Sequence, residues 1–277
     1  MAKTILITGA SSGIGRATAR YFNEQGWNVV ATMRTPDKET ELNQLENVLV
    51  TRLDVQDEAS IENAVKASIE RFGKIDVLLN NAGYGLGGPL EAMSMDQIRR
   101  QFEVNVFGLV ATMKALIPHF RENSDGVIIN VSSVGGRMSF PFFTLYHGTK
   151  FAVEGISEAL SYEMGTIGVR MKIVEPGAIK TDFVGRSMEL VNDESLVEYQ
   201  GLMQSFSAAM EGDMMANASE PKLVAEVIYA AATDESDQLR YLAGADAEQY
   251  MANRDSQDDA TFLGGIRQMF GLEAATT

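Results

Sequence analysis

Hydrophobic residues along the chain alternate between short β-branched runs and longer stretches with helical spacing. The short runs predict strands at Thr4–Thr8, Asn28–Met33, Val48–Asp54, Val77–Asn80, Val127–Ser132, Val169–Glu175 and Leu239–Leu242. Most of these runs are continuously apolar, which is typical of strands that are buried on both faces. The pattern therefore predicts a parallel sheet with helices on each side.

Helical periodicity fills the intervals between these strands. The helices are expected near residues 14–22, 61–72, 94–118 and 147–165, and after residue 219. Ser94 and Gln97 match a capping box at the start of the third helix, which should reach toward Pro118. Repeated strand–helix alternation indicates an α/β fold, a doubly wound, Rossmann-like parallel sheet. Because no linker interrupts it, residues 1–277 are expected to form a single domain.

One interval departs from this rhythm. From residue 182 to 217 the predicted strands stop, and Met and Phe accumulate at Met188, Met203, Phe206, Met210, Met214 and Met215. We interpret residues 182–218 as an insertion within the same domain. Apolar residues at helical spacing are typical of core or oligomer packing, whereas a methionine-rich, flexible segment can also close over an apolar ligand. Both interpretations stay open.

Composition narrows the possible functions. The chain has no cysteine, which excludes disulfides, thiolate metal sites and cysteine nucleophiles. Its net charge of -15 disfavours binding to nucleic acid or to anionic membrane surfaces. No apolar run approaches the roughly 18 residues of a membrane span, and the start of the chain does not resemble a signal peptide, so a cytoplasmic location is expected. The isolated residues His119 and His147 do not suggest a metal site.

A glycine- and serine-rich turn follows the first predicted strand. Gly9 allows a sharp turn, Gly13 allows the backbone to approach a pyrophosphate, and Gly15 allows close helix packing. Ser11 and Ser12 add hydroxyl donors, and the helix that follows offers free N–H groups to phosphate. An ordinary strand–helix turn could share this composition, but the position between strand and helix favours dinucleotide binding.

Further motifs follow in order on the later elements: Asn80-Asn81-Ala82-Gly83, Asn105, Ser132-Ser133, Tyr146-x-x-x-Lys150 and Pro176-Gly177…Thr181. Together with the glycine-rich turn they resemble the single-domain short-chain dehydrogenase/reductase family. The resemblance covers residues 3–183 closely and residues 219–245 more loosely. It implies an oxidoreductase that moves a hydride between a nicotinamide coenzyme and a carbonyl or alcohol.

The chemistry of the Tyr146 and Lys150 pair can also be argued from the residues. Their spacing places both on one face of a helix. A free tyrosine has a pKa of about 10, and a neighbouring ammonium lowers this pKa and favours the phenolate. A tyrosine tuned in this way could exchange a proton with a carbonyl oxygen during hydride transfer. Such a pair alone could be an ordinary surface pair, but Ser133 and Asn105 favour catalysis.

The resemblance implies a role for each of these residues. Tyr146 is the acid/base, Lys150 tunes Tyr146 and binds the nicotinamide ribose, Ser133 orients the carbonyl, and Asn105 anchors a proton-relay water. Ser132 is the rival of Ser133 and is interpreted as a strand-end hydroxyl. The expected coenzyme site comprises Gly9, Ser11, Ser12, Gly13, Ile14, Gly15, Arg34, Asp54, Val55, Asn81, Ala82, Gly83, Tyr146, Lys150, Pro176, Gly177, Ile179 and Thr181.

The resemblance also places a substrate-binding loop at residues 183–215, which we expect to be mobile and to order over its ligands. Six residues that follow other motif ends could line the same pocket: Tyr84, Leu86, Met138, Phe140, Phe142 and Phe143. Such a pocket suits a hydrophobic small-molecule carbonyl or alcohol. The long helices near 94 and 147 resemble those of the family's usual dimer interface, so a homodimer or homotetramer is expected.

Coenzyme choice depends on the end of the second strand, where an acidic residue would select NAD. Met33 occupies that position and carries no charge, and the guanidinium of Arg34 could bind a 2′-phosphate. Asp37 and Glu39 could pair with Arg34 or oppose the phosphate. We therefore expect NADP(H) to be preferred, with NAD(H) possible.

Two other functions stay open at this stage. Sugar-nucleotide epimerases and dehydratases resemble longer chains with a sizeable C-terminal substrate domain, whereas about sixty residues follow Ser219 here. A non-catalytic coenzyme sensor would not need Ser133, Tyr146 and Lys150 together.

Overall fold

The fold is taken from a computed structural model, which describes residues 2–181, 186–210, 212, 215 and 217–272. Its central feature is a seven-stranded sheet with the order β3-β2-β1-β4-β6-β7-β9. The strands are β1 Thr4–Ile7, β2 Asn28–Met33, β3 Val48–Arg52, β4 Val77–Asn80, β6 Gly126–Val131, β7 Val169–Pro176 and β9 Arg240–Ala243. All neighbouring pairs in this sheet are parallel. The predicted doubly wound fold is confirmed.

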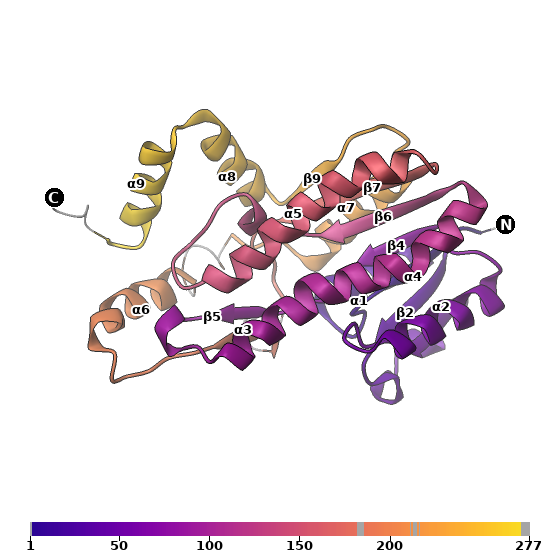
Figure 1. Cartoon of the computed structure of the whole chain (residues 1–277), viewed down its shortest axis with the longest axis horizontal. Helices are drawn as coiled ribbons and strands as arrows, with labels where there is room; N and C mark the ends of the chain where they lie inside the picture. Colours follow the sequence, from indigo (N-terminus) through magenta and orange to yellow (C-terminus); the bar gives the residue numbers. More distant parts are fainter. Residues whose placement is uncertain (1, 182–185, 211, 213–214, 216, 273–277) are drawn as a thin grey trace.

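Helices cover both faces of the sheet (Figure 1). They are α1 Gly13–Glu24, α2 Glu58–Phe72, α3 Met95–Phe102, α4 Gly108–Asn123, α5 Thr144–Gly165, α6 Val197–Ala209, α7 Pro221–Thr233, α8 Ala245–Ser256 and α9 Asp259–Met269. Apolar residues of α1 and α7 pack on one face of the sheet, and those of α2, α4 and α5 pack on the other. Successive residues of one strand, such as Ile5 and Leu6, therefore belong to different cores. None of the described helices is long and apolar enough to span a membrane.

The long helix that begins after the Ser94 cap differs from the prediction in two ways. A π-helical turn, Glu103–Phe107, joins α3 to α4. The helix also continues through Pro118 as far as Asn123. Phe120 is fully buried in the core, and burial of an aromatic side chain can offset the cost of one proline in a helix.

The interval from 182 to 217 contains regular structure that the pattern did not predict. A short strand, β8 Met188–Leu190, pairs in parallel with β5 Gly85–Gly87 to form a second sheet. Helix α6 follows it. The expectation that strands stop in this interval is therefore wrong, because a three-residue strand shows no periodicity and depends on a distant partner. Met214 and the first residues of the proposed insertion, 182–185, lie outside the described part of the chain.

The C-terminal helices α8 and α9 share an apolar cluster with α6, and α8 also contacts β9. Figure 1 shows them at the left, the end of the molecule toward which β6 points. Phe206 of α6 stacks on Phe270 after α9, with ring centroids 6.2 Å apart. Both rings belong to an apolar cluster that also includes Phe142 and Phe143. This cluster covers the carboxyl ends of the strands, where parallel α/β sheets bind ligands.

Candidate active site

A cavity of about 1330 Å³ lies at the carboxyl ends of the strands. All of the residues expected to bind coenzyme line it except Gly15, and Ser133 lines it as well. Asn105 and Gly15 are not among the lining residues. The structure thus gathers residues from β1 to β7 into one cavity.

The glycine-rich turn has the geometry of an anion site. Gly9 has a φ of +71° and Gly13 a φ of +53°, in the left-handed region that favours glycine. A Cβ on Gly15 would lie 2.4 Å from the Gly9 carbonyl oxygen, so Gly15 serves close packing of α1 rather than contact with a ligand. Ser12 precedes α1 without capping it through its side chain. The first N–H groups of α1 are therefore free to bind phosphate.

Asn81 and Thr8 join the ends of β4 and β1. The Asn81 side-chain amide donates to the carbonyl oxygens of Thr8, at 2.9 Å, and Gly9, at 3.2 Å. The Thr8 hydroxyl accepts from the backbone N–H groups of Asn81 and Ala82, each at 3.0 Å. Asn81 therefore shapes the turn as well as lining the cavity. The sequence analysis missed this role of Thr8.

Asn105 lies buried in the π-helical turn, and its side chain forms hydrogen bonds with other protein groups. Its Oδ1 accepts from the Tyr84 N–H at 3.0 Å, and its Nδ2 donates to the Tyr84 carbonyl oxygen at 2.8 Å. Nδ2 also lies 3.2 Å from the Thr149 hydroxyl of α5. Asn105 thus connects the segment after Gly83 to α5, and in this structure it does not reach the cavity.

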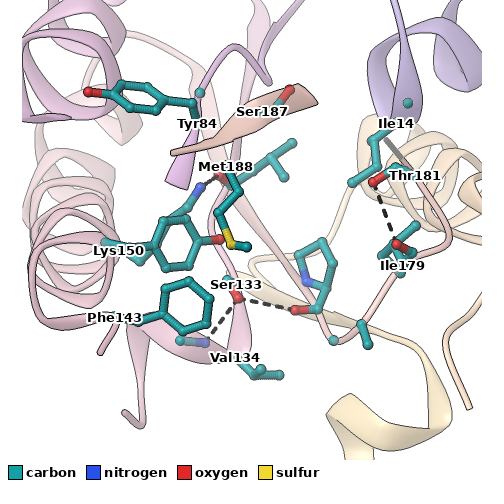
Figure 2. A pocket seen from close by; sticks show the side chains of 18 of the residues that line it. Ile14, Tyr84, Ser133, Val134, Phe143, Lys150, Ile179, Thr181, Ser187 and Met188 are labelled. Carbon is teal, nitrogen blue, oxygen red and sulfur yellow. Dashed lines mark hydrogen bonds between the residues drawn. The ribbon is translucent and has the colours of Figure 1, made fainter. Parts of the chain in front are cut away.

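Tyr146 and Ser133 come together as the spacing predicts. The Ser133 hydroxyl lies close enough to the Tyr146 phenol to lower the pKa of that phenol. It accepts from the Gly135 N–H at 3.0 Å and donates to the Pro176 carbonyl oxygen at 3.4 Å. Lys150 lies on the same side of α5, with its Nζ 5.6 Å from the centroid of the Tyr146 ring. This amine donates to the Val131 carbonyl oxygen at 2.9 Å. Figure 2 shows Ser133, Lys150 and Phe143 around the same part of the cavity.

Burial is the main influence on the pKa values of Tyr146 and Lys150. It raises the pKa of Tyr146 to about 12, against the opposing effect of the Ser133 hydroxyl. It lowers the pKa of Lys150 to about 8, against the opposing charge of Glu154. Burial is thus the larger effect on the pKa of Tyr146 in this structure, and the lowering of that pKa by Lys150 stays a prediction.

Ser132 and His147 lie beside this group. The Ser132 hydroxyl is buried and has no hydrogen-bond partner in the described part of the chain. His147 packs inside the protein and is 5% exposed. Its Nδ1 donates to the Gly135 carbonyl oxygen and its Nε2 accepts from the Phe140 N–H, each at 2.8 Å. His147 therefore fixes the loop after Ser133. The only sequence signal for this role was the position of His147 next to Tyr146.

Arg34 lines the cavity next to the end of β2. Its side chain is exposed and forms no ion pair within the described residues. Glu39, which could have opposed a phosphate, forms a short ion pair with Arg16 instead. Its other oxygen accepts from the N–H groups of Glu41, at 2.9 Å, and Leu42, at 3.0 Å. The guanidinium of Arg34 is thus available to a ligand.

The loop after β7 is held by a residue from outside the predicted motifs. Asp246, in the first turn of α8, accepts from the Ala178 N–H at 2.7 Å. A Cβ on Gly177 would lie 2.2 Å from the Asp246 carboxylate, so only glycine permits this approach. Asp246 was not predicted from the sequence, since nothing in its local pattern distinguishes it.

The apolar residues proposed for the pocket divide into two groups. Tyr84, Phe140, Phe143, Met188, Met210 and Met215 line the cavity. Leu86, Met138, Phe142, Met203 and Phe206 are buried in the protein and do not line it. The expected pocket is therefore wrong for Leu86, Met138 and Phe142, which face the core. The methionine-rich interval supplies both cavity wall and packing, so neither interpretation excludes the other.

Comparison with known proteins identifies the family. The family model described as short chain dehydrogenase matches residues 3–191. The chain belongs to this family. As a short-chain dehydrogenase, it is an NAD(P)-dependent oxidoreductase. An uncharacterised oxidoreductase of Schizosaccharomyces pombe is 48% identical over 240 residues, which cover 87% of this chain and 100% of the relative. A 3-ketodihydrosphingosine reductase of Bacteroides thetaiotaomicron is 42% identical over 179 residues, 65% of each chain.

Solved structures show the same fold. A short-chain dehydrogenase from Streptomyces avermitilis has a TM-score of 0.81 at 31% identity, and 98% of each chain is covered. ElxO, solved with NADP bound, has a TM-score of 0.74 at 29% identity over 90% of this chain and all of its own. A 3-ketoacyl-(acyl-carrier-protein) reductase from Brucella melitensis, complexed with NADH, has a TM-score of 0.73 at 27% identity over 87% and 95% of the two chains. Similar structures thus hold either coenzyme.

Proposed function

We propose that this short-chain dehydrogenase transfers a hydride between NADP(H) and a carbonyl or secondary alcohol of a hydrophobic small molecule, with Tyr146 as the acid/base. The observation that carries the proposal is that Tyr146 and Ser133 line one cavity together with the glycine-rich turn, Lys150 and several apolar side chains. The glycine turn, the uncapped start of α1 and the Lys150 amine fit a nicotinamide dinucleotide.

The protonation of the site suits carbonyl reduction at neutral pH. When bound, the coenzyme supplies the hydride. Because burial raises its pKa to about 12, Tyr146 carries its proton at neutral pH and can donate it to the carbonyl oxygen as negative charge develops there. Ser133 forms a hydrogen bond to the same oxygen and orients it. The ammonium of Lys150 stabilises the phenolate that remains.

Arg34 supports a preference for NADP(H). Met33 cannot accept from a ribose 2′-hydroxyl, and the buried acid Glu39 is paired with Arg16. One charge-assisted hydrogen bond to the phosphate contributes roughly 1.5–3 kcal/mol, so kcat/KM should favour NADP(H) by about 10- to 100-fold. Measuring kcat/KM with both coenzymes at moderate ionic strength tests this proposal. A preference for NAD(H) would contradict it.

The apolar wall supports a hydrophobic substrate. Phe140, Phe143 and Met188 line the cavity beside Tyr146. The Bacteroides relative, named for a keto compound, agrees with a ketone as the reacting group.

The test of this function is coenzyme oxidation at 340 nm with a panel of apolar ketones and aldehydes. Turnover that rises with the apolar area of the ketone is expected. Coenzyme binding without turnover of any ketone, aldehyde or alcohol would favour a sensor and contradict the proposal.

We also propose that the protein assembles as a homodimer or homotetramer through α4 and α5. Phe107, immediately before α4, is 57% exposed, and Phe151 of α5 is 49% exposed. Large exposed aromatic side chains of this kind are typical of association surfaces. Sedimentation velocity of the wild type and of Phe107→Ser/Phe151→Ser tests the assignment, with dissociation of the double variant expected.

A further inference from the structure

A group of buried charges lies behind Lys150, on the side away from Tyr146 along α5. It consists of Glu154, Glu175 of β7, Arg137 and Arg240 of β9, and we refer to these four residues as the charge cluster. Glu154 is 6% exposed and Glu175 is fully buried. Buried carboxylates are costly unless a specific arrangement of charges compensates them.

Arg240 is the centre of the charge cluster. Its Nε lies 3.0 Å from Glu154 Oε2 and 3.3 Å from Glu175 Oε1. Its Nη2 lies 2.6 Å from Glu158 Oε2, at the exposed end of the group. Arg137 approaches Glu175 Oε2 at 3.6 Å and pairs with Asp255 of α8 at 2.9 Å. Four elements of the fold therefore meet at these charges.

Glu154 is the member that lies on the same helix as Lys150. The two residues are four apart on α5 and share a face. A Cβ on Gly136 would lie 2.9 Å from Glu154 Cγ, 2.7 Å from the Ser132 hydroxyl and 3.0 Å from the Lys150 carbonyl oxygen. The loop after Ser133 thus packs directly on Glu154. One Glu154 oxygen, Oε1, is buried and has no hydrogen-bond partner in the described residues, whereas Oε2 accepts from Arg240.

Burial and the neighbouring charges shift the pKa values of Lys150 and Glu175 in opposite directions. Burial lowers the pKa of Lys150 to about 8, and the negative charge of Glu154 counteracts this decrease. Burial and the neighbouring Glu154 raise the pKa of Glu175 to about 7, while Arg137 and Arg240 lower it. When Glu175 is protonated and neutral, the positive charge of Arg240 is paired with the carboxylates of Glu154 and Glu158.

We propose that Glu154, held in place by Arg240, is a positioning residue that keeps the Lys150 side chain as the ammonium ion beside Tyr146. The inference rests on the proposed function, because Lys150 matters only if Tyr146 exchanges a proton with the substrate. Without the Glu154 charge, the partly buried amine of Lys150 would lose its proton closer to neutral pH. The phenolate of Tyr146 would then lack its stabilising cation.

The test measures the protonation of Lys150 directly. The Cε resonances of 13C-labelled lysine are followed by NMR from pH 6 to pH 11, and Lys150→Arg assigns the Lys150 signal by its disappearance. In Glu154→Gln the titration midpoint of Lys150 should fall by about one pH unit, since an opposite charge nearby shifts a pKa by one unit or more. Glu158→Gln is the matched control: it removes a carboxylate from the same arginine, one turn further from Lys150. Its midpoint should stay at the wild-type value.

A second measurement links the titration to the reaction. The alkaline limb of the kcat/KM profile for ketone reduction should move to lower pH in Glu154→Gln by the same amount, and Glu154→Asp, which keeps the charge, should restore most of the change. An unchanged Lys150 midpoint in Glu154→Gln overturns the inference. If that variant does not fold, Glu154→Ala is measured in its place: its Lys150 midpoint should also fall, and an unchanged midpoint would overturn the inference. A wild type without turnover contradicts the proposed function instead, and the NMR titration still decides the role of Glu154.

Discussion

Tyr146 is the residue on which the proposed reaction depends most directly. Replacing Tyr146 with Phe removes only the hydroxyl and should lower kcat by roughly 100- to 10,000-fold, the range for loss of a general acid/base. The affinity for NADPH, measured by fluorescence, should stay the same because the ring remains. Tyr162→Phe is a suitable control, since Tyr162 is on the same helix and is 75% exposed. More than half of wild-type turnover in Tyr146→Phe, with chemistry rate-limiting, would refute the assignment.

His147 gives the fold a dependence on acid. Because its Nε2 accepts from the Phe140 N–H, protonation of the ring would place two donors against each other. Burial lowers the pKa of His147 to about 4 from its usual 6.5. Between these values the unfolded chain binds the proton and the folded chain does not, so the free energy of unfolding should decrease as the pH falls from 6.5 toward 4. The decrease amounts to about 3 kcal/mol at most.

Urea unfolding at several pH values measures this effect. His147→Gln, which keeps an acceptor for Phe140, should be less stable at pH 7.5 but should lose less stability on acidification than the wild type. His119→Gln leaves His147 in place and should retain the full loss. Equal acid dependence in His147→Gln and the wild type would show that His147 does not cause it.

At the scale of elements, the features that the sequence predicted correctly depend on local interactions. The features that were missed depend on contacts between residues far apart in the chain. The strands at Asn28–Met33 and Val77–Asn80 were predicted to the residue, because continuous apolar runs encode burial on both faces locally. Strands β5 and β8 were not predicted, since each has three residues and needs a partner about a hundred residues away. Asp246 and the charge cluster were also missed. Their roles depend on α8, β7 and β9 meeting in space, which no local spacing reveals.

The segment from residue 183 to 215 is the element for which we expect a change on ligand binding. We propose that its continuously described part, residues 186–210, is mobile in the free enzyme and orders over coenzyme and substrate. Met188, Met210 and Met215 line the cavity from this segment, so a ligand there adds apolar contacts to it. Limited proteolysis should cut first within this segment, and NADPH with a ketone should protect it. Uniform resistance of the free enzyme would favour simple packing.

At the scale of the whole molecule, we propose that residues 1–277 unfold as a single unit. The two cores share one sheet, and α5 connects them to the C-terminal helices: Val153 packs in a core against the sheet, while Tyr146 packs against the aromatic cluster of α6 and α9. Calorimetry at one protein concentration should therefore show one transition, with equal calorimetric and van't Hoff enthalpies per cooperative unit. NADPH at a hundred times its Kd should stabilise that whole transition by about 2.7 kcal/mol. Two transitions, only one of them shifted by NADPH, would show instead that the C-terminal helices form a separate unit, and the coenzyme would then stabilise the sheet alone.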